Sequence, residues 1–257
     1  MQRPFHRLAI VNRGEAAMRV IHAVRELNEA GRSEPIRLIS LYTEPERNAM
    51  FIRHADEAFD LGTASFVDPS DGSQKNRYLD YTTLERALVA TDADAAWVGW
   101  GFVAEHPRFA ELCEQLGIVF VGPDAAVMRR LGDKINAKRL AEETDVPVAP
   151  WSGGPVEDAD EALRHAQEIG FPLLVKASAG GGGRGIRRAE NPAELRHAFD
   201  HARAEALSAF GDATVLLEKL ITPARHVEVQ VIADGFDGVW AVGVRDCSVQ
   251  RRSQKVI

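Results

Sequence analysis

Cysteine is scarce in this sequence. Only Cys113 and Cys247 occur among 257 residues, far apart and in unlike surroundings. Two such cysteines cannot build a disulfide framework or supply the thiolates of the common four-ligand zinc sites. The sequence therefore predicts a protein of a reducing compartment.

An excess of basic residues and a long apolar run are also absent. Lysine and arginine total 31 against 38 aspartate and glutamate, so the net charge is -7. A surface for nucleic acid or for an anionic membrane requires the opposite balance. The apolar run at 8–11 is too short for a signal peptide or a membrane span. We therefore expect a cytoplasmic protein that binds neither nucleic acid nor membrane.

The apolar residues of the first half alternate between two periods. Short apolar runs, typical of buried strands, are separated by stretches with apolar residues at helical spacing. The expected strands are 8–11, 38–41, 95–98 and 118–121. One helix is expected to end at Gly31, and another to begin at a capping-box pattern at Thr82 and Glu85. This alternation predicts βαβ units and a largely parallel sheet in an α/β protein.

A second structural unit is expected after a segment rich in proline and glycine at 146–155. Its expected elements are a helix at 160–169, a strand at 173–176, a helix from 192, and strands at 215–218, 227–232 and 239–244. The helix from 192 has the clearest start, because Asn191 can cap it, Pro192 suits its first turn and Glu194 favours its positive end. The last two strands are expected to form a hairpin whose first strand is half exposed.

The densest chemical signal is the stretch KASAGGGGRG at 176–185. Its glycines let the backbone approach a ligand closely and turn N–H groups toward phosphate oxygens. It is not a Walker A loop, because no Lys-Ser or Lys-Thr pair follows the glycines. It is not a dinucleotide fingerprint, because a strand rather than a helix follows. A flexible surface hairpin is the alternative, but Lys176 and Arg184 beside the glycines favour a phosphate-binding loop.

Two further segments are less informative alone. The stretch NRGE at 12–15 has one glycine where a dinucleotide turn needs three, which indicates a plain strand-to-helix turn. The stretch RDCSVQRRSQK at 245–255 concentrates four cationic side chains. If it is extended, Arg251, Ser253 and Lys255 lie on one side and can hold an anion. A solvated edge strand protected by its charges is the alternative.

Together the motifs resemble the biotin carboxylases of the ATP-grasp superfamily, including the biotin carboxylase parts of acetyl-CoA and related acyl-CoA carboxylases. The matching stretches are AIVNRGE at 9–15, GWGF at 99–102 with Glu105, GDK at 132–134, the glycine stretch at 176–185, EK at 218–219, RHVEVQ at 225–230 and the stretch at 245–255. The resemblance implies a doubly wound parallel sheet in an N-terminal domain (1–130), a connecting helix (131–145), an ATP-grasp lid (146–217) and the start of an antiparallel catalytic domain (218–257).

The same resemblance implies roles for individual residues. The implied nucleotide-binding residues are Lys134, Lys176, Gly181, Gly182, Gly183, Arg184, Gly185, Glu218, Lys219, Ile221, His226 and Gln250. Among them, Lys134 and Lys176 would contact the ATP phosphates under the glycine loop, and Glu218 would contact adenine. The implied catalytic residues are Lys255, which matches a lysine that helps to hold bicarbonate, and Arg251. Such a set suits phosphoryl transfer, which depends on positioning and charge neutralisation.

The implied reaction is ATP-dependent carboxylation of biotin with bicarbonate through carboxyphosphate. ATP, Mg2+ and biotin on a carrier domain are the implied cofactors and substrates. Bicarbonate, the carrier domain and a carboxyltransferase are the implied partners, and family members often dimerise. The alternatives are another ATP-grasp ligase, of carbamoyl-phosphate or carboxylate-amine type, and a nucleotide-binding fragment without catalysis.

Two features bear on the protein beyond this stretch. The family's magnesium carboxylates and general base match positions after Ile257, so we expect no metal ligands within 1–257 and little turnover by these residues alone. Ser253 stands where single-function bacterial members usually have histidine, and GWGF at 99–102 with PWSG at 150–153 is more like the large multidomain acyl-CoA carboxylases. We therefore expect a longer parent polypeptide.

Overall fold

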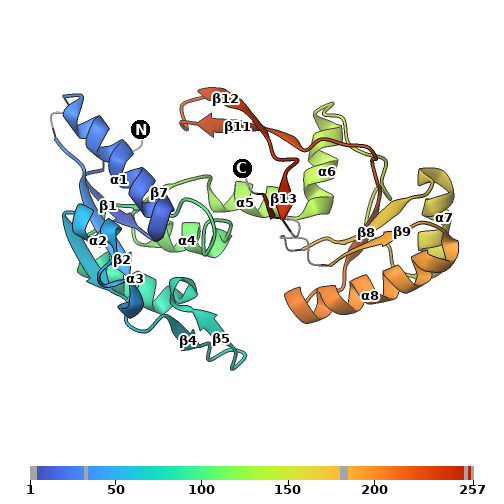
Figure 1. Ribbon diagram of the computed structural model, residues 1–257, viewed down its shortest axis with the longest axis horizontal. Helices are drawn as coiled ribbons and strands as arrows, with labels where there is room; N and C mark the ends of the chain where they lie inside the picture. Colours follow the sequence, from blue (N-terminus) through green and yellow to red (C-terminus); the bar gives the residue numbers. More distant parts are fainter. Residues whose placement is uncertain (1–4, 32–33, 180–184, 252–253, 256–257) are drawn as a thin grey trace. The chain divides into compact units, whose positions relative to one another are not determined.

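The chain divides into two compact units, Met1–Arg129 and Arg130–Ile257 (Figure 1). The computed structural model describes residues 5–31, 34–179, 185–251 and 254–255. Among the helices of these residues, none combines the length and the apolar character that a membrane span requires. Each unit has its own core and is described separately.

The first unit contains a parallel sheet, a small hairpin and short helices. Its strands are β1 (Arg7–Ile10), β2 (Arg37–Tyr42), β3 (Glu57–Asp60), β4 (Ser65–Val67), β5 (Gln74–Asn76), β6 (Ala95–Trp97) and β7 (Val119–Val121). Its helices are α1 (Gly14–Glu29), η1 (Glu44–Glu46), α2 (Met50–His54), η2 (Arg77–Leu79), α3 (Tyr81–Ala90), α4 (Pro107–Gln115) and the greater part of α5 (Ala125–Gly132).

Helices cover both faces of the five-stranded parallel sheet, whose strand order is β3-β2-β1-β6-β7. Successive side chains of a strand point to opposite faces, so Leu8 and Ile10 enter one core layer and Ala9 and Val11 the other. The first layer includes apolar residues of α1 and α2, namely Ala17, Ile21, Val24 and Phe51. The second includes residues of α3 and α4, namely Leu84, Ala87, Leu88, Phe109 and Cys113. The first unit is therefore a doubly wound α/β fold.

The four expected strands of this unit are confirmed, with two corrections nearby. The edge strand β3 was not expected, because its charged sequence EAFD and its alternating exposure lack an apolar run. The start of α3 was expected at Thr82, but the N-cap is Asp80, whose carboxylate accepts from Thr83 N at 3.2 Å and Thr83 Oγ1 at 2.6 Å. A carboxylate that reaches the free N–H groups of the first turn sets the helix start two residues earlier.

The second unit is built from antiparallel strands and three helices within its described residues. Its strands are β8 (Leu173–Ala177), β9 (Ile186–Ala189), β10 (Val215–Lys219), β11 (Val227–Ala233), β12 (Val239–Asp246), β13 (Gln250–Arg251) and β14 (Gln254–Lys255). Its helices are α6 (Lys134–Glu143), α7 (Ala159–Ile169) and α8 (Pro192–Phe210). The strands form a sheet of order β10-β8-β9 and the pairs β11-β12 and β13-β14.

One face of the β10-β8-β9 sheet packs on α7 and α8, which are yellow and orange in Figure 1. The core residues of this face are Leu173, Val175, Val215 and Leu217 from the strands, with Ala162, Ala166, Leu195, Phe199 and Ala202 from the helices. The expected start of α8 is confirmed, since Asn191 accepts from Glu194 N at 3.0 Å and Pro192 follows it. Strand alternation leaves Lys176 and Glu218 on the sheet face opposite this core.

The last strands differ from expectation in two ways. The hairpin β11-β12 is confirmed, but its first strand is not half exposed, because Val229 and Ile232, on opposite faces, are 52% and 51% exposed. The stretch at 245–255 is not one extended strand. Arg251 pairs antiparallel with Gln254, so the chain reverses direction between them. Arg251 and Lys255 therefore do not belong to one continuous strand, and Ser253, which was expected beside them, lies outside the described residues.

Candidate nucleotide-binding site

Two lysines share the carboxylate of Glu218 on the open face of the β10-β8-β9 sheet. Lys176 lies opposite Leu216, so Glu218, two residues further along β10, projects from the same face. Lys176 Nζ donates to Glu218 Oε1 in a close ion pair. Lys138, from α6, approaches Glu218 Oε2 with its Nζ at 2.7 Å. Each carboxylate oxygen therefore has its own ammonium partner.

This cluster is largely shielded from solvent. The side chains of Lys138 and Glu218 are 15% exposed, and that of Lys176 is 20% exposed. Burial by itself would raise the pKa of Glu218, but the hydrogen bonds and charges of Lys138 and Lys176 outweigh it and hold that pKa below its ordinary value. Glu218 is thus ionised at neutral pH and pairs with both ammonium groups at once.

Lys134 lies where β8 runs into the glycine stretch. Its Nζ donates to the carbonyl of Ala177 at 2.9 Å and to those of the next two residues at 3.4 Å each. Burial lowers the pKa of Lys134, and the nearby positive charge of Lys176 lowers it further. The like charges of Lys134 and Lys176 repel each other, and an anion bound near both would stabilise them.

Asp133 fixes the start of the helix that carries both Lys134 and Lys138. As the N-cap of α6 it accepts from Asn136 N at 2.8 Å, and its other oxygen accepts from Ser178 Oγ at 2.5 Å. The backbone N–H of Lys134 also donates to Ser178 O at 3.3 Å. One aspartate therefore joins the helix start to the residue that follows β8.

The glycine loop itself is only partly described. Gly181, Gly182, Gly183 and Arg184 lie outside the described residues. Gly185 is the first residue after them, with φ +66°, and a Cβ there would lie 2.6 Å from Ala177 Cβ. Its carbonyl accepts from Ala177 N at 2.8 Å. Strand β9 pairs antiparallel with β8, in agreement with the expectation that a strand follows the glycine stretch.

The remaining predicted nucleotide-binding residues lie in two places. Lys219 Nζ donates to Phe171 O at 2.7 Å and Gly170 O at 3.2 Å, so its ammonium group is occupied by the turn before β8. Ile221 is 53% exposed. His226 and Gln250 meet each other, with 3.0 Å between His226 Nδ1 and Gln250 Nε2.

The two predicted catalytic residues lie next to this second pair along the chain. Arg251 is exposed on β13. The backbone of Lys255 pairs with Gln250 across the β13-β14 turn. Among the predicted residues, the structure thus brings Lys134, Lys176 and Glu218 together in one place and His226 and Gln250 in another.

The sequence reasoning missed Lys138 and Asp133. A lysine four residues after Lys134 lies on the same face of a helix, and an aspartate directly before it suits an N-cap. That spacing would have placed Lys138 beside Lys134. It would not have revealed Glu218 as its partner, because strand and helix meet only in the folded unit.

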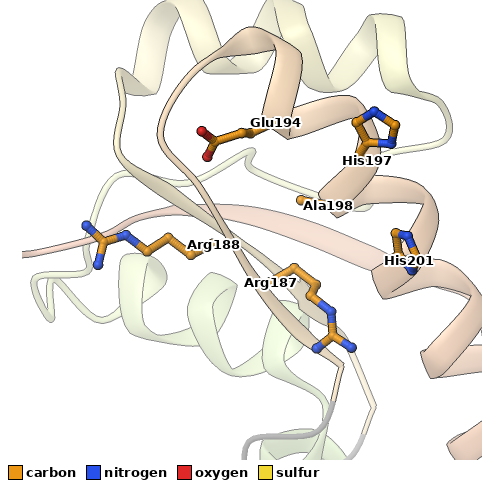
Figure 2. A pocket seen from close by; sticks show the side chains of 6 residues that line it. All are labelled: Arg187, Arg188, Glu194, His197, Ala198 and His201. Atoms are coloured by element: carbon orange, nitrogen blue, oxygen red, sulfur yellow. The ribbon is translucent and has the colours of Figure 1, made fainter.

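A separate shallow pocket of about 370 Å³ lies between β9 and α8 (Figure 2). It is lined by Arg187, Arg188, Glu194, His197, Ala198 and His201. Arg187 pairs with Glu205 at 2.7 Å, and Arg188 pairs with Glu190. Because both arginines have carboxylate partners and no predicted residue lines this pocket, it is not the candidate site.

The described residues do not fit a metal centre. Within 5–31, 34–179 and 185–251, no group of three or more His, Cys, Asp or Glu side chains is arranged to hold a metal ion. The expectation that Mg2+ ligands lie after Ile257 stays a prediction.

Comparison with known families agrees with this geometry. Residues 4–128 match the family described as "Biotin carboxylase, N-terminal domain", and residues 133–257 match "Carbamoyl-phosphate synthase L chain, ATP binding domain". The protein named biotin carboxylase 1 from Bacillus subtilis (strain 168) is 41% identical over 98% of this chain. The chain belongs to the biotin carboxylase family. Biotin carboxylases are ligases of the ATP-grasp superfamily.

Solved biotin carboxylase structures confirm the fold class. The Campylobacter jejuni biotin carboxylase in a β,γ-ATP complex is 38% identical, with a TM-score of 0.87 over 98% of this chain and 53% of that one. The biotin carboxylase domain dimer of Hydrogenobacter thermophilus 2-oxoglutarate carboxylase, with MgADP, ADP and bicarbonate, is 41% identical, with a TM-score of 0.85 over 99% of this chain and 52% of that one. The chain spans about half the length of the Bacillus subtilis protein, 52%, and 20% of the pyruvate carboxylase 1 of Caenorhabditis elegans.

Proposed function

We propose that this chain forms the nucleotide-binding part of a ligase that carboxylates biotin with bicarbonate, coupled to ATP cleavage. One observation carries the proposal: the ammonium group of Lys134 lies where β8 meets the glycine stretch, and the charge of Lys176, on the same strand, is near enough to lower the pKa of Lys134. Neighbouring cationic side chains suit the phosphates of a nucleotide. The relatives solved with ATP, ADP and bicarbonate support the same assignment.

Each predicted residue has a role in this proposal. Lys134 and Lys176 neutralise phosphate charge, and the backbone of the glycine loop at 181–185 covers the phosphates. The segment from Glu218 through Lys219 to Ile221 contacts adenine, and His226 with Gln250 lies along the nucleotide. Lys255 and Arg251 hold bicarbonate. The boundaries of the lid at 146–217 and of the catalytic domain from 218 belong to the same proposal.

Calorimetric titration of residues 1–257 with ATP tests the site. Replacing Lys176 by alanine removes a phosphate partner, and we expect the affinity to fall about tenfold or more, as for loss of a charge-assisted hydrogen bond. Lys75→Ala is the matched control, since Lys75 pairs with Asp68 and Asp71 in the first unit. An unchanged affinity in Lys176→Ala would show that the site assignment is wrong.

The complete reaction requires the full-length protein. We expect its ATP cleavage to depend on bicarbonate and to be stimulated by free biotin. The absence of both effects, where a known biotin carboxylase is active, would contradict the proposed reaction. Residues 1–257 alone are expected to show little turnover, and robust magnesium-dependent ATPase activity of these residues would contradict that expectation.

The proposal extends to the biotin carboxylase component of an acetyl-CoA or acyl-CoA carboxylase, with a biotin carrier domain and a carboxyltransferase as partners. The tryptophan versions of the motifs at 99–102 and 150–153 support this assignment. Relatives of other specificity exist, since one matched domain belongs to a 2-oxoglutarate carboxylase. Carboxylation assays of the assembled enzyme with acetyl-CoA, propionyl-CoA, pyruvate and 2-oxoglutarate would distinguish the acceptors.

A second candidate is a carbamoyl-phosphate or carboxylate-amine ligase. It is favoured by one observation, the family description that matches residues 133–257. The N-terminal match at 4–128 favours biotin carboxylation instead. Ammonia dependence of ATP cleavage in place of biotin stimulation would decide for the second candidate.

A further inference from the structure

Lys176 has a carboxylate partner that nucleotide binding must replace. Its ammonium group is paired with Glu218 Oε1. If Lys176 moves to a phosphate, Glu218 loses that partner although its side chain is only 15% exposed. A partly buried carboxylate without a counter-charge is strongly unfavourable. The transfer of Lys176 is therefore favourable only if something else holds Glu218.

We propose that Lys138 is a positioning residue that keeps Glu218 paired, so that Lys176 can pass from this carboxylate to a nucleotide phosphate. The inference rests on the proposed nucleotide-binding role of Lys176. Lys138 does not need to touch the nucleotide. It acts through Glu218, whose second oxygen it holds at 2.7 Å.

In this proposal, Lys138 stays paired with Glu218 while Lys176 moves to the phosphate. Lys138 and Lys176 bind different oxygens of Glu218 and come from different elements, α6 and β8. The loss of one pair therefore leaves the other intact. Lys176 lies on the strand that leads directly into the glycine stretch, whereas Lys138 lies in the second turn of a helix capped by Asp133.

Trp151 holds Lys138 in place. The Lys138 ammonium lies 5.5 Å from the centre of the Trp151 ring, within the range of a cation–π contact. The indole itself is anchored, because its Nε1 donates to Glu142 Oε1 at 2.6 Å and its backbone bridges to Glu218. Helix α6, Trp151 and β10 thus form one connected support for the Lys138–Glu218 pair.

Removing Lys138 should strengthen the hold of Glu218 on Lys176. Without Lys138, Lys176 is the remaining ammonium partner of Glu218 among the described residues. If Lys176 then moved to a phosphate, Glu218 would lose that partner too. ATP would then compete directly with the carboxylate for Lys176. Adenosine, which has no phosphate, would not need Lys176 to move. The inference therefore predicts a loss of affinity that depends on the phosphates.

Two binding measurements on residues 1–257 test the role of Lys138. Calorimetry measures the affinity for ATP, and ligand-observed NMR measures the affinity for adenosine. We expect Lys138→Met to weaken ATP binding about tenfold and to leave adenosine binding unchanged. Lys138→Arg should restore most of the ATP affinity, since it keeps the charge. Lys138→Gln is the second neutral variant if the methionine variant does not fold, and Lys75→Met is the matched control for loss of a lysine.

A double-mutant cycle with Glu218→Gln separates action through Glu218 from direct action. In the Glu218→Gln background, Lys138→Met should have no further effect on ATP binding. A further loss there would mean that Lys138 contacts the nucleotide itself, which overturns the inference. Equal losses for ATP and adenosine would indicate a merely structural role and also overturn it.

Two variants distinguish a wrong role for Lys138 from a wrong nucleotide-binding site. If Lys176→Ala leaves ATP binding intact, the site assignment fails and the role of Lys138 fails with it. If Lys176→Ala weakens ATP binding while Lys138→Met does not, only the role of Lys138 is wrong.

Discussion

At the residue scale, the carboxylate of Glu218 balances part of the positive charge of the neighbouring lysines. Three ammonium groups, of Lys134, Lys138 and Lys176, lie in this part of the second unit, and two of them pair with this one carboxylate. The excess of positive charge favours an anionic ligand, while the carboxylate of Glu218 compensates part of it. The same residue therefore contributes to stability and restrains Lys176.

The stability contribution of Glu218 should depend on pH. The folded chain holds the pKa of Glu218 below its ordinary value of about 4.3. The contribution is thus present above about pH 4.3 and is lost as the pH falls through the folded-state pKa. Glu218→Gln should reduce the free energy of unfolding at pH 7 by about 1–3 kcal/mol, and the difference from the parent should shrink toward pH 3.

Thermal or urea unfolding of both proteins across this pH range measures the effect. Glu29→Gln, at the exposed end of α1, is the control for loss of a glutamate. A difference between Glu218→Gln and the parent that stays constant down to pH 3 would contradict the charge-based account.

At the scale of elements, the β8-β9 hairpin requires a glycine where the loop returns. Gly185 has φ +66°, and an added Cβ would meet Ala177 Cβ at 2.6 Å. Gly211, at the C-cap of α8, has a similar φ of +74° but no atom within 4 Å of an added Cβ. The two glycines therefore share the backbone requirement and differ only in the close contact.

Comparing Gly185→Ala with Gly211→Ala measures the cost of the close contact between an added Cβ and Ala177 Cβ. Both should destabilise the second unit through the left-handed φ, by about 1 kcal/mol. Gly185→Ala should cost a further 1–3 kcal/mol or so, as overpacking does, and should weaken ATP binding because the loop is displaced. Thermal unfolding and ATP titration measure the two effects. Equal stability of the two variants would show that the Ala177 contact is relieved at no cost.

Elements with a buried apolar run or a strong cap could be predicted from the sequence. The strands at 8–11 and 38–41 are buried on both faces, so their sequences are apolar apart from Ser40. Helix α8 begins where Asn191 and Pro192 indicate. The edge strand β3 could not be predicted in this way, because a strand exposed on one side of a sheet has no apolar run.

Part of the candidate site could be predicted from the sequence, and part could not. Lys176 and the glycines are adjacent in sequence, so their combination is visible without a fold. The partnership of Lys138 with Glu218 joins residues far apart in the chain and depends on where α6 packs. A single lysine or glutamate in a helix or strand is usually solvated, so neither residue signals its partner.

At the scale of the whole molecule, each unit has a separate core, but β11-β12 exposes apolar side chains on both faces. The exposed apolar residues of this hairpin are Val227, Val229, Val231, Ile232, Val239, Trp240, Val242 and Val244. The chain thus presents exposed apolar side chains on both faces of paired strands whose outer edges are open in the described residues. Surfaces of this kind bind apolar probes and promote association between copies.

Residues 1–257 should therefore bind the dye ANS and self-associate as the protein concentration rises. Val244 is 68% exposed and lies opposite Val229, so Val244→Lys places a charge in the middle of the apolar surface. This variant should lower both ANS fluorescence and the apparent mass in light scattering. Val89→Lys is the matched control, because Val89 is 62% exposed on α3, away from the hairpin. If the two variants reduce ANS binding equally, the dye binds elsewhere and the hairpin is not the associating surface.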